Sequence, residues 1–238
     1  MHTANSSWKP LYQIGAIAAL LAAYGFRRSI SAELSLFNGC GLFAMPPAMP
    51  ATAAEWFALF QSDGLLGLAL LDFFDLVEYA LVGLMFTAIY VALERTRRSA
   101  ALLALLFGLT GITVAFASNR AFGMLSLSQQ YAAATTEARR AALLSAGEAL
   151  LGSGYNTGWF VGLFLVLLAG MIFSILMLRS PVFGKTTAWM GILASGFGML
   201  LFPTFILAPT LLWIGPSLSA PFRLIWYTLI AIKLLRNQ

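Results

Sequence analysis

The sequence predicts an all-α polytopic membrane protein in which residues 1–238 form one domain, a bundle of six transmembrane helices. Apolar stretches long enough to cross a bilayer recur along most of the chain, most clearly at residues 159–178, 100–118 and 188–207. Hydrophobic residues make up 60% of the chain and charged residues only 10%, against about 45–50% and about 25% in ordinary globular chains. A soluble domain of this length could not bury so much hydrocarbon, so the bilayer must be its solvent.

The six predicted spans differ in length, and several carry signals at their ends. The first and the last are short, because about 17–25 helical residues are needed to cross the hydrocarbon core. Pro203 should kink the fifth span and Pro209 should end it. Ser219 is the expected N-cap of the sixth span, with Pro221 in its first turn. The predicted spans are residues 10–26, 70–93, 99–118, 155–178, 186–208 and 220–235.

Two long connections are each expected to carry an amphipathic helix outside the hydrocarbon core. In the first, residues 27–69, Thr52 and Glu55 form a capping-box pattern that opens a short helix rich in aromatic residues. In the second, residues 119–154, alanines and leucines alternate with charged residues and glutamines. We therefore expect one interfacial or extramembrane helix over residues 127–151 that covers one end of the bundle.

Basic residues predict the orientation in the membrane. Cytoplasmic connections carry an excess of Lys and Arg, and an inside N-terminus places eight cations on the cytoplasmic side. Both termini are therefore expected in the cytoplasm, in a multi-pass protein of the cell membrane. Membrane lipids are the expected partners and nucleic acid is not, because the net charge of +5 reflects cations beside apolar segments. Those eight cations are Lys9, Arg95, Arg97, Arg98, Arg179, Lys185, Lys233 and Arg236.

Two arginines and three acids do not fit a simple hydrophobic wall. Arg27 and Arg28 fall at the outer end of the first span and need anionic partners there. Asp72, Asp75 and Glu78 are three residues apart, so they fan over roughly 120° of one helix face, with Glu78 about 9 Å deeper than Asp72. An ionised acid inside a bilayer costs several kcal/mol unless it faces protein, water or a cation. The acids should therefore point into the bundle.

These acids are expected to meet other polar residues in a pocket that opens outward. Arg120 is the best predicted partner for Asp72 or Asp75. The pocket is either a structural charge network or a site for a ligand or a proton. Three carboxylates with arginines nearby make a poor cage for a hard cation, so no metal is expected. The predicted pocket residues are Asp72, Asp75, Glu78, Asn119, Arg120, Asn156 and Arg223.

Small and reactive residues add further constraints. Gly154, Gly158 and Gly162 lie four apart and predict a close helix–helix contact, either within the chain or in a homodimer. A single cysteine, Cys40, excludes an internal disulfide and is expected to be a buried small hydrophobe. A single histidine, His2, leaves no His/Cys metal cluster and no Ser/His/Asp nucleophile arrangement. No cofactor is expected.

Several stretches in order resemble a known family. They are AEWFALFQ at residues 54–61, LGLALLD at 66–72, AIYVALER at 88–95, LSLSQQYAAAT at 125–135 and MLRSPVFGK at 177–185. Together they resemble the bacterial domain of unknown function 4386 family of multi-pass membrane proteins over about residues 55–238. The resemblance implies a six-helix protein of bacterial or archaeal type in the inner membrane. It implies no activity and no catalytic residues, and only Asp72 of the three acids falls within a matched stretch.

Three functions remain open at this stage. The first is a non-enzymatic protein that binds a lipid or small amphiphile in its outer pocket, as a sensor, scaffold or accessory subunit. The second is a small proton-coupled transporter or permease in which Asp75 or Glu78 carries the proton. The third, least favoured because no nucleophile pattern is present, is an intramembrane enzyme that acts on lipid with paired carboxylates as acid and base.

Overall fold

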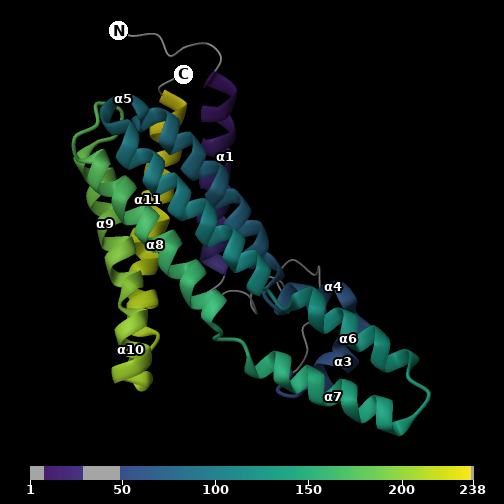
Figure 1. Ribbon diagram of the computed structural model, residues 1–238. Helices are drawn as coiled ribbons and strands as arrows, with labels where there is room; N and C mark the ends of the chain where they lie inside the picture. Colours follow the sequence, from purple (N-terminus) through teal and green to yellow (C-terminus); the bar gives the residue numbers. More distant parts are fainter. Residues whose placement is uncertain (1–7, 29–48, 237–238) are drawn as a thin grey trace.

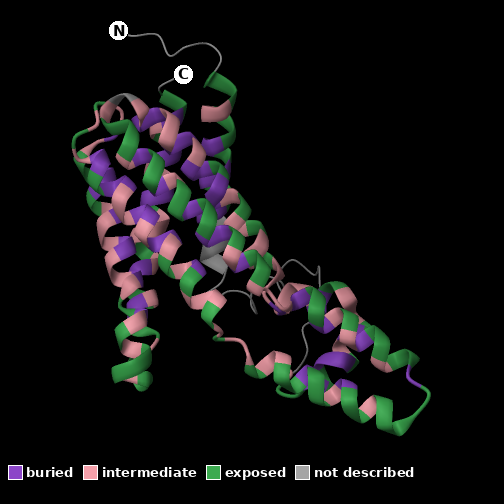
Figure 2. Cartoon of the chain, viewed as in Figure 1, coloured by how far each residue is buried: buried purple, intermediate pink, exposed green. Residues whose placement is uncertain are grey.

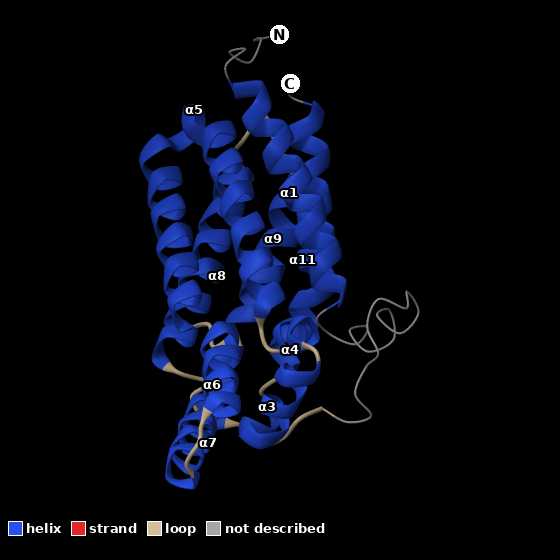
Figure 3. Cartoon of the chain, turned by 90° about the vertical axis from the view of Figure 1, so that its right-hand side faces the viewer, coloured by secondary structure: helices blue, strands red, loops and turns tan. Residues whose placement is uncertain are grey.

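The computed structural model describes residues 8–28 and 49–236, and in this part of the chain every regular element is a helix (Figures 1 and 3). The helices form two parts. The bundle consists of α1 (Lys9–Arg28), α5 (Phe73–Ser118), α8 (Thr157–Met177), α9 (Lys185–Met199), α10 (Leu201–Leu207) and α11 (Ile214–Arg236). The cap unit, at one end of the bundle, consists of α3 (Ala53–Ser62), α4 (Gly64–Leu70), α6 (Ala121–Ala133) and α7 (Glu137–Gly152).

Five helical stretches are long and apolar enough to cross a membrane, which confirms a multi-pass helical membrane protein. The predicted span at residues 10–26 corresponds to α1, whose apolar part, Lys9–Ala23, is shorter than these five. A count of six spans therefore stays a prediction. The five stretches are Phe73–Glu94, Thr96–Ala133, Glu137–Met177, Lys185–Leu207 and Pro209–Arg236.

Helix α5 contains the first of these stretches and the start of the second, which continues into α6. Arg97 has non-helical backbone angles, φ −154° and ψ 78°, and this residue breaks α5 into two parts. The second part ends at Ser118, as expected from the apolar run, and Asn119 and Arg120 separate it from α6. The break lies at the same end of the bundle as the start of α1, the end of α11 and the connection between α8 and α9 (Figure 1).

The bundle helices are neighbours in a closed ring. Helix α1 packs against α5 and α11, α8 packs against α5 and α9, and α9 packs against α11. The interior holds the buried core, which Figure 2 shows as buried residues inside the bundle. Ala16, Ala19 and Ala22 line the buried face of α1, where small side chains let the helix approach its neighbours closely. Many large apolar side chains stay exposed on the outside, as expected of a surface that faces lipid.

The cap unit has a small core of its own. Helix α3 begins with the expected capping box between Thr52 and Glu55. Its aromatic face does not lie on a lipid surface, because Trp56, Phe57 and Phe60 are buried against α6 and α7. Helices far apart in sequence are also joined by hydrogen bonds, since the backbone N–H of Ala53 donates to Glu148 Oε1 over 2.8 Å.

Two sequence expectations about helix limits are wrong. Residues 127–151 are not one helix: the chain breaks at residues 134–136, and Thr136 caps α7 by accepting from the backbone N–H of Arg139. The last span does not start at 220, because α11 begins at Ile214 and contains Pro221 in its interior. Ser219 is therefore no N-cap, and its hydroxyl donates to the carbonyl of Ala194 over 2.7 Å.

The fifth span behaves as expected from its prolines. The helix is interrupted between α9 and α10 at Leu200, just before Pro203, and α10 ends at Leu207 ahead of a short 3₁₀ turn, Pro209–Leu211. The expectations for His2 and Cys40 fall outside the described residues.

Candidate functional site

Two adjoining cavities lie at the cap end of the bundle. The outer cavity lies at the junction with the cap unit, and the inner cavity lies inside the ring of helices. The outer cavity measures about 470 Å³ and the inner one about 180 Å³. Asp75, Tyr79 and Trp159 line both cavities, so the two chambers share a wall. We call them together the two-chambered pocket.

The three acids follow this pocket inward. Asp72 lines only the outer chamber, Asp75 lines both, and Glu78 lines only the inner chamber. The spacing of Asp75 and Glu78 keeps them on one side of α5 while moving them along its axis, and Asp72 lies just before the helix begins. The expected inward-facing stripe is therefore the polar wall of a pocket that reaches from the rim into the bundle.

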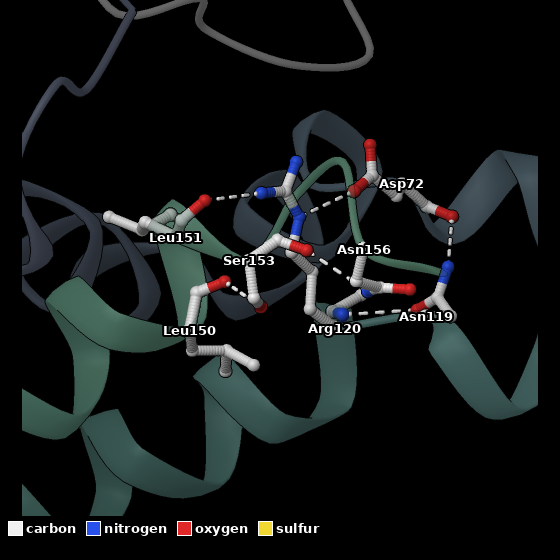
Figure 4. A network of polar contacts seen from close by, with 8 residues as sticks. Asp72, Asn119, Arg120, Leu150, Leu151, Ser153 and Asn156 are labelled. Atoms are coloured by element: carbon white, nitrogen blue, oxygen red, sulfur yellow. Dashed lines mark hydrogen bonds and ion pairs between the residues drawn. The ribbon is translucent and has the colours of Figure 1, made fainter. Parts of the chain in front are cut away.

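Arg120 holds the rim of the outer chamber together (Figure 4). Its Nε donates to Asp72 Oδ2 over 2.9 Å, and its Nη1 donates to the carbonyl of Leu151 over 2.9 Å. Asp72 joins α4 to α5, Arg120 joins α5 to α6, and Leu151 ends the last full turn of α7. One guanidinium thus ties together all three described places where the chain passes between the bundle and the cap unit.

Asp72 also has an unusual backbone. Its φ of 62° and ψ of 9° place it in the left-handed region, and it is the one non-glycine residue with positive φ in the described chain. Such a conformation is uncommon outside glycine, although Asp tolerates it better than most residues. Asn119 supports it, because its Nδ2 donates to the Asp72 carbonyl over 2.8 Å while its Oδ1 accepts from the backbone N–H of Ala121. The turn into α5 is therefore held by two hydrogen bonds, from Asn119 to the Asp72 carbonyl and from Arg120 to the Asp72 carboxylate.

Asn156 does not line either chamber, contrary to expectation. It is the N-cap of α8, and its Oδ1 accepts from the backbone N–H of Trp159 over 2.9 Å. Its Nδ2 donates to the carbonyl of Ser153 over 3.0 Å (Figure 4). Both side-chain atoms are thus committed to starting the helix. Its place beside the pocket follows from its position at the helix end rather than from ligand contact.

The inner chamber contains a pair of opposite charges across the ring. Arg223 Nη1 lies 4.0 Å from Glu78 Oε1, and their side chains are only 25% and 18% exposed. Because α11 begins at Ile214, Arg223 lies nine residues into the helix, about 13 Å along its axis. A span that starts at residue 220, as the sequence predicts, would put Arg223 in its first turn. The earlier start of α11 corrects this and places the guanidinium beside Glu78, the deepest of the three acids.

The rest of the inner chamber combines polar groups with apolar walls. Tyr79, Tyr227 and Ser195 lie around the charged pair. Trp226 is 3% exposed, and its indole Nε1 has no hydrogen-bond partner among the described residues. The apolar part of the lining consists of Val82, Phe86, Leu163, Val166 and Leu167. Sequence reasoning missed the tyrosines and the tryptophan, although Arg223, Trp226 and Tyr227 have the spacing of one helix face.

Beyond the inner chamber the bundle is densely packed. Phe86 and Phe173 lie with their ring centroids 5.2 Å apart, and both are nearly fully buried. Met85 and Ile89 continue this core along α5. Within the described residues, the pocket therefore extends inward from the cap end and stops at this aromatic layer.

The glycine ridge, Gly154, Gly158 and Gly162, forms contacts within the chain. A Cβ on Gly162 would lie 2.9 Å from the carbonyl oxygen of Gly111, and one on Gly158 would collide with the hydroxyl of Ser118. A Cβ on Gly154 would lie 2.5 Å from Arg120 Nη1. The ridge therefore lets α8 approach α5 and leaves room for the guanidinium at the rim.

Two other expectations concern the partners of Arg27 and Arg28 and the absence of a metal site. The side chains of Arg27 and Arg28 lie outside what the structure describes, so their anionic partners stay a prediction. In the described residues, no three His, Cys, Asp or Glu side chains gather closely enough to hold a metal ion. The three acids are spread along the pocket rather than converging on one point.

Comparisons with known proteins give no relative for this chain. No family model, curated protein or solved structure matches it. The function must therefore be argued from the pocket itself.

Proposed function

We propose that this protein is a non-enzymatic membrane protein that binds a small amphiphile in the two-chambered pocket, as a sensor, scaffold or accessory subunit. The observation that carries the proposal is the acid stripe. It passes from Asp72 at the rim, through Asp75 in the shared wall, to Glu78 beside Arg223 inside the bundle. A pocket that only stabilised the fold would not need a polar wall continued to this depth, because buried charge is costly.

The chemistry of the inner chamber favours a neutral or zwitterionic polar group. Glu78 and Arg223 carry opposite charges, so a net charge on the ligand would leave one charge uncompensated in a low-dielectric interior. Their 4.0 Å separation exceeds the 2.7–2.9 Å typical of a charge-assisted hydrogen bond. A hydroxyl or amide between them would accept from the guanidinium and donate to the carboxylate.

The size and walls of the pocket favour a single hydrocarbon chain. The outer chamber, about 470 Å³, falls within the range of about 300–1,000 Å³ typical of ligand pockets, and the inner chamber alone does not. Leu163, Val166 and Leu167 add apolar surface to the lining of the inner chamber, which also contains the charged pair. A molecule with one chain and one small polar group satisfies both surfaces.

A thermal-shift experiment on the purified protein tests this proposal. The probes are monoacylglycerol (neutral), lysophosphatidylethanolamine (zwitterionic), a fatty acid and an alkylamine. The first two should raise Tm more than the charged chains, since a ligand at about 100 times its Kd stabilises by about 2.7 kcal/mol. Glu78→Gln and Arg223→Gln should each lose this shift. Glu94→Gln is the matched control, because Glu94 faces Arg98 outside the pocket.

Either of two results would contradict amphiphile binding. One is the absence of any shift with all four probes. The other is a shift of the same size in wild type, Glu78→Gln and Arg223→Gln, which would place the probe elsewhere on the protein.

The distribution of cations supports an orientation with the pocket on the extracytoplasmic side. The end of the bundle opposite the cap unit carries the start of α1, the end of α11 and the basic turn at Arg97, and the positive-inside rule assigns this end to the cytoplasm. Ser145 is exposed on α7 of the cap unit. A Ser145→Cys variant on a Cys40→Ser background should react with an impermeant maleimide in intact cells. Labelling only after permeabilisation would reverse the orientation.

A proton-coupled transporter is the second candidate, and one observation favours it. Glu78 and Arg223 face each other between α5 and α11, which lie across the ring rather than side by side. Movement of one helix would separate the pair and change the proton affinity of the carboxylate. This function predicts substrate flux across liposomes that a pH gradient drives and that Glu78→Gln abolishes. Unchanged flux in that variant would reject Glu78 as the proton carrier.

Membership of the domain of unknown function 4386 family and a homodimer are also proposals. The first is supported by the five ordered stretches of similar sequence between residues 54 and 185. The second needs a surface other than the glycine ridge, because Gly158 and Gly162 already contact α5.

A further inference from the structure

A third cavity lies at the opposite end of the bundle from the two-chambered pocket. It measures about 220 Å³ and is formed between the break in α5 and the end of α8. Both elements mark the place where apolar helices give way to basic residues, so the cavity lies at the edge of the hydrocarbon layer. Its lining consists of Thr96, Arg97, Ile175, Leu176, Leu178 and Arg179.

The cavity combines two cations with an apolar floor. Arg97 and Arg179 are exposed, and neither forms an ion pair with a carboxylate in the part of the chain that the structure describes. The nearby acid, Glu94, faces Arg98 instead, at 3.5 Å. Ile175 is 50% exposed on the outer surface of α8, beside the cavity. Positive charge and hydrocarbon therefore meet at one place.

We propose that this cavity binds the phosphate diester of an anionic phospholipid. Guanidinium groups match the geometry of phosphate oxygens and are weakly hydrated, so two of them form a favourable phosphate site. The apolar residues would contact the upper part of an acyl chain, which free phosphate lacks. Basic pockets at the ends of membrane helices are a recurrent way to hold such head groups. The site is separate from the two-chambered pocket and does not depend on its function.

Native mass spectrometry of the purified protein in detergent tests the site. Phosphatidylglycerol should form a specific one-to-one adduct more strongly than phosphatidylcholine of the same chain length. Removal of each arginine should weaken phosphatidylglycerol binding about fivefold, and Arg97→Gln with Arg179→Gln about 25-fold. The matched control is Arg98→Gln, a neighbouring exposed arginine that is already paired with Glu94; it should bind as wild type does.

Additional arms separate the sources of phosphate and check folding. The double lysine variant, Arg97→Lys with Arg179→Lys, retains the charge but loses the planar guanidinium fork, so it should bind better than the double glutamine variant and more weakly than wild type. Inorganic phosphate in large excess should not displace the lipid. An unchanged thermal melting curve shows that the double glutamine variant is folded.

Three outcomes would overturn the proposal. Equal phosphatidylglycerol binding by wild type and the double glutamine variant would show that the arginines are not the site. An equal loss in Arg98→Gln would reduce the effect to general surface charge. Full displacement by inorganic phosphate would leave a phosphate site without a role for the lipid chain.

Discussion

Replacing Arg120 by alanine should loosen the cap unit from the bundle without unfolding either part. The side chain makes two hydrogen bonds of 2.9 Å, to the Asp72 carboxylate and to the Leu151 carbonyl. Asp72 is 38% and Arg120 23% exposed, so solvent screening limits the ion pair to about 1 kcal/mol. The bond to the carbonyl contributes about 1 kcal/mol more. The free energy of local opening at the junction should therefore fall by about 2 kcal/mol, equivalent to about 30-fold faster exchange.

Amide hydrogen exchange measures this opening directly. The backbone N–H of Gly154 donates to the Leu151 carbonyl and that of Ala121 donates to Asn119, so both amides report on the junction. Their protection should fall about 30-fold in Arg120→Ala and less in Arg120→Lys, which keeps the charge but loses the two-directional fork. Amides at the centre of α8 should not change.

The control is Arg140→Ala. This arginine also lies in the cap unit, but its ion pair with Glu137 is largely exposed to solvent. The Arg140→Ala variant should leave amide hydrogen exchange at the junction unaltered. Unchanged protection at Gly154 in Arg120→Ala would refute the clamp, and so would faster exchange spread evenly over the whole chain.

Three further changes have expected outcomes. Gly162→Ala should lower stability by about 1–3 kcal/mol through overpacking against α5, measured as a lower Tm, whereas Gly196→Ala in α9 should not, because its Cβ would meet only ordinary contacts. Glu148→Ala should weaken α3 docking by about 1–2 kcal/mol, seen as faster exchange at Ala53, and unchanged exchange would reject the hydrogen bond between α7 and α3. Val166→Trp should fill the inner chamber and abolish the thermal shift with monoacylglycerol, and a persisting shift would move the ligand out of that chamber.

Most of the membrane helices could be predicted because hydrocarbon imposes a simple rule on sequence. Residues 99–118 and 155–178 agree with the structure within about two residues at each end, since polar residues bound both apolar runs. The start of α11 was missed because Gly215 and Pro216 are typical of turns in water. At the edge of a membrane, unsatisfied backbone groups cost more, so the helix continues through them.

The candidate site was accessible to sequence reasoning only where it depends on one helix. The spacing of Asp75 and Glu78 places them on one face of α5, and both line the pocket together with Asp72 at its start. The depth of Arg223 depends on where its own helix begins, and Asn156 depends on which backbone groups need a cap. Neither follows from periodicity, because both are set by where a helix begins.

The hydrogen bond between Ala53 and Glu148 has a consequence for biosynthesis. The two residues are 95 positions apart, and both membrane crossings of α5 are translated between them. At about 5–20 residues per second, α3 leaves the ribosome roughly 5–20 seconds before its partner α7 exists. During that interval α3 can pack only against α4 and later α6, and the contact of Phe57 with Gly147 of α7 is missing. The growing chain must therefore keep this side of Phe57 from other apolar surfaces until α7 emerges.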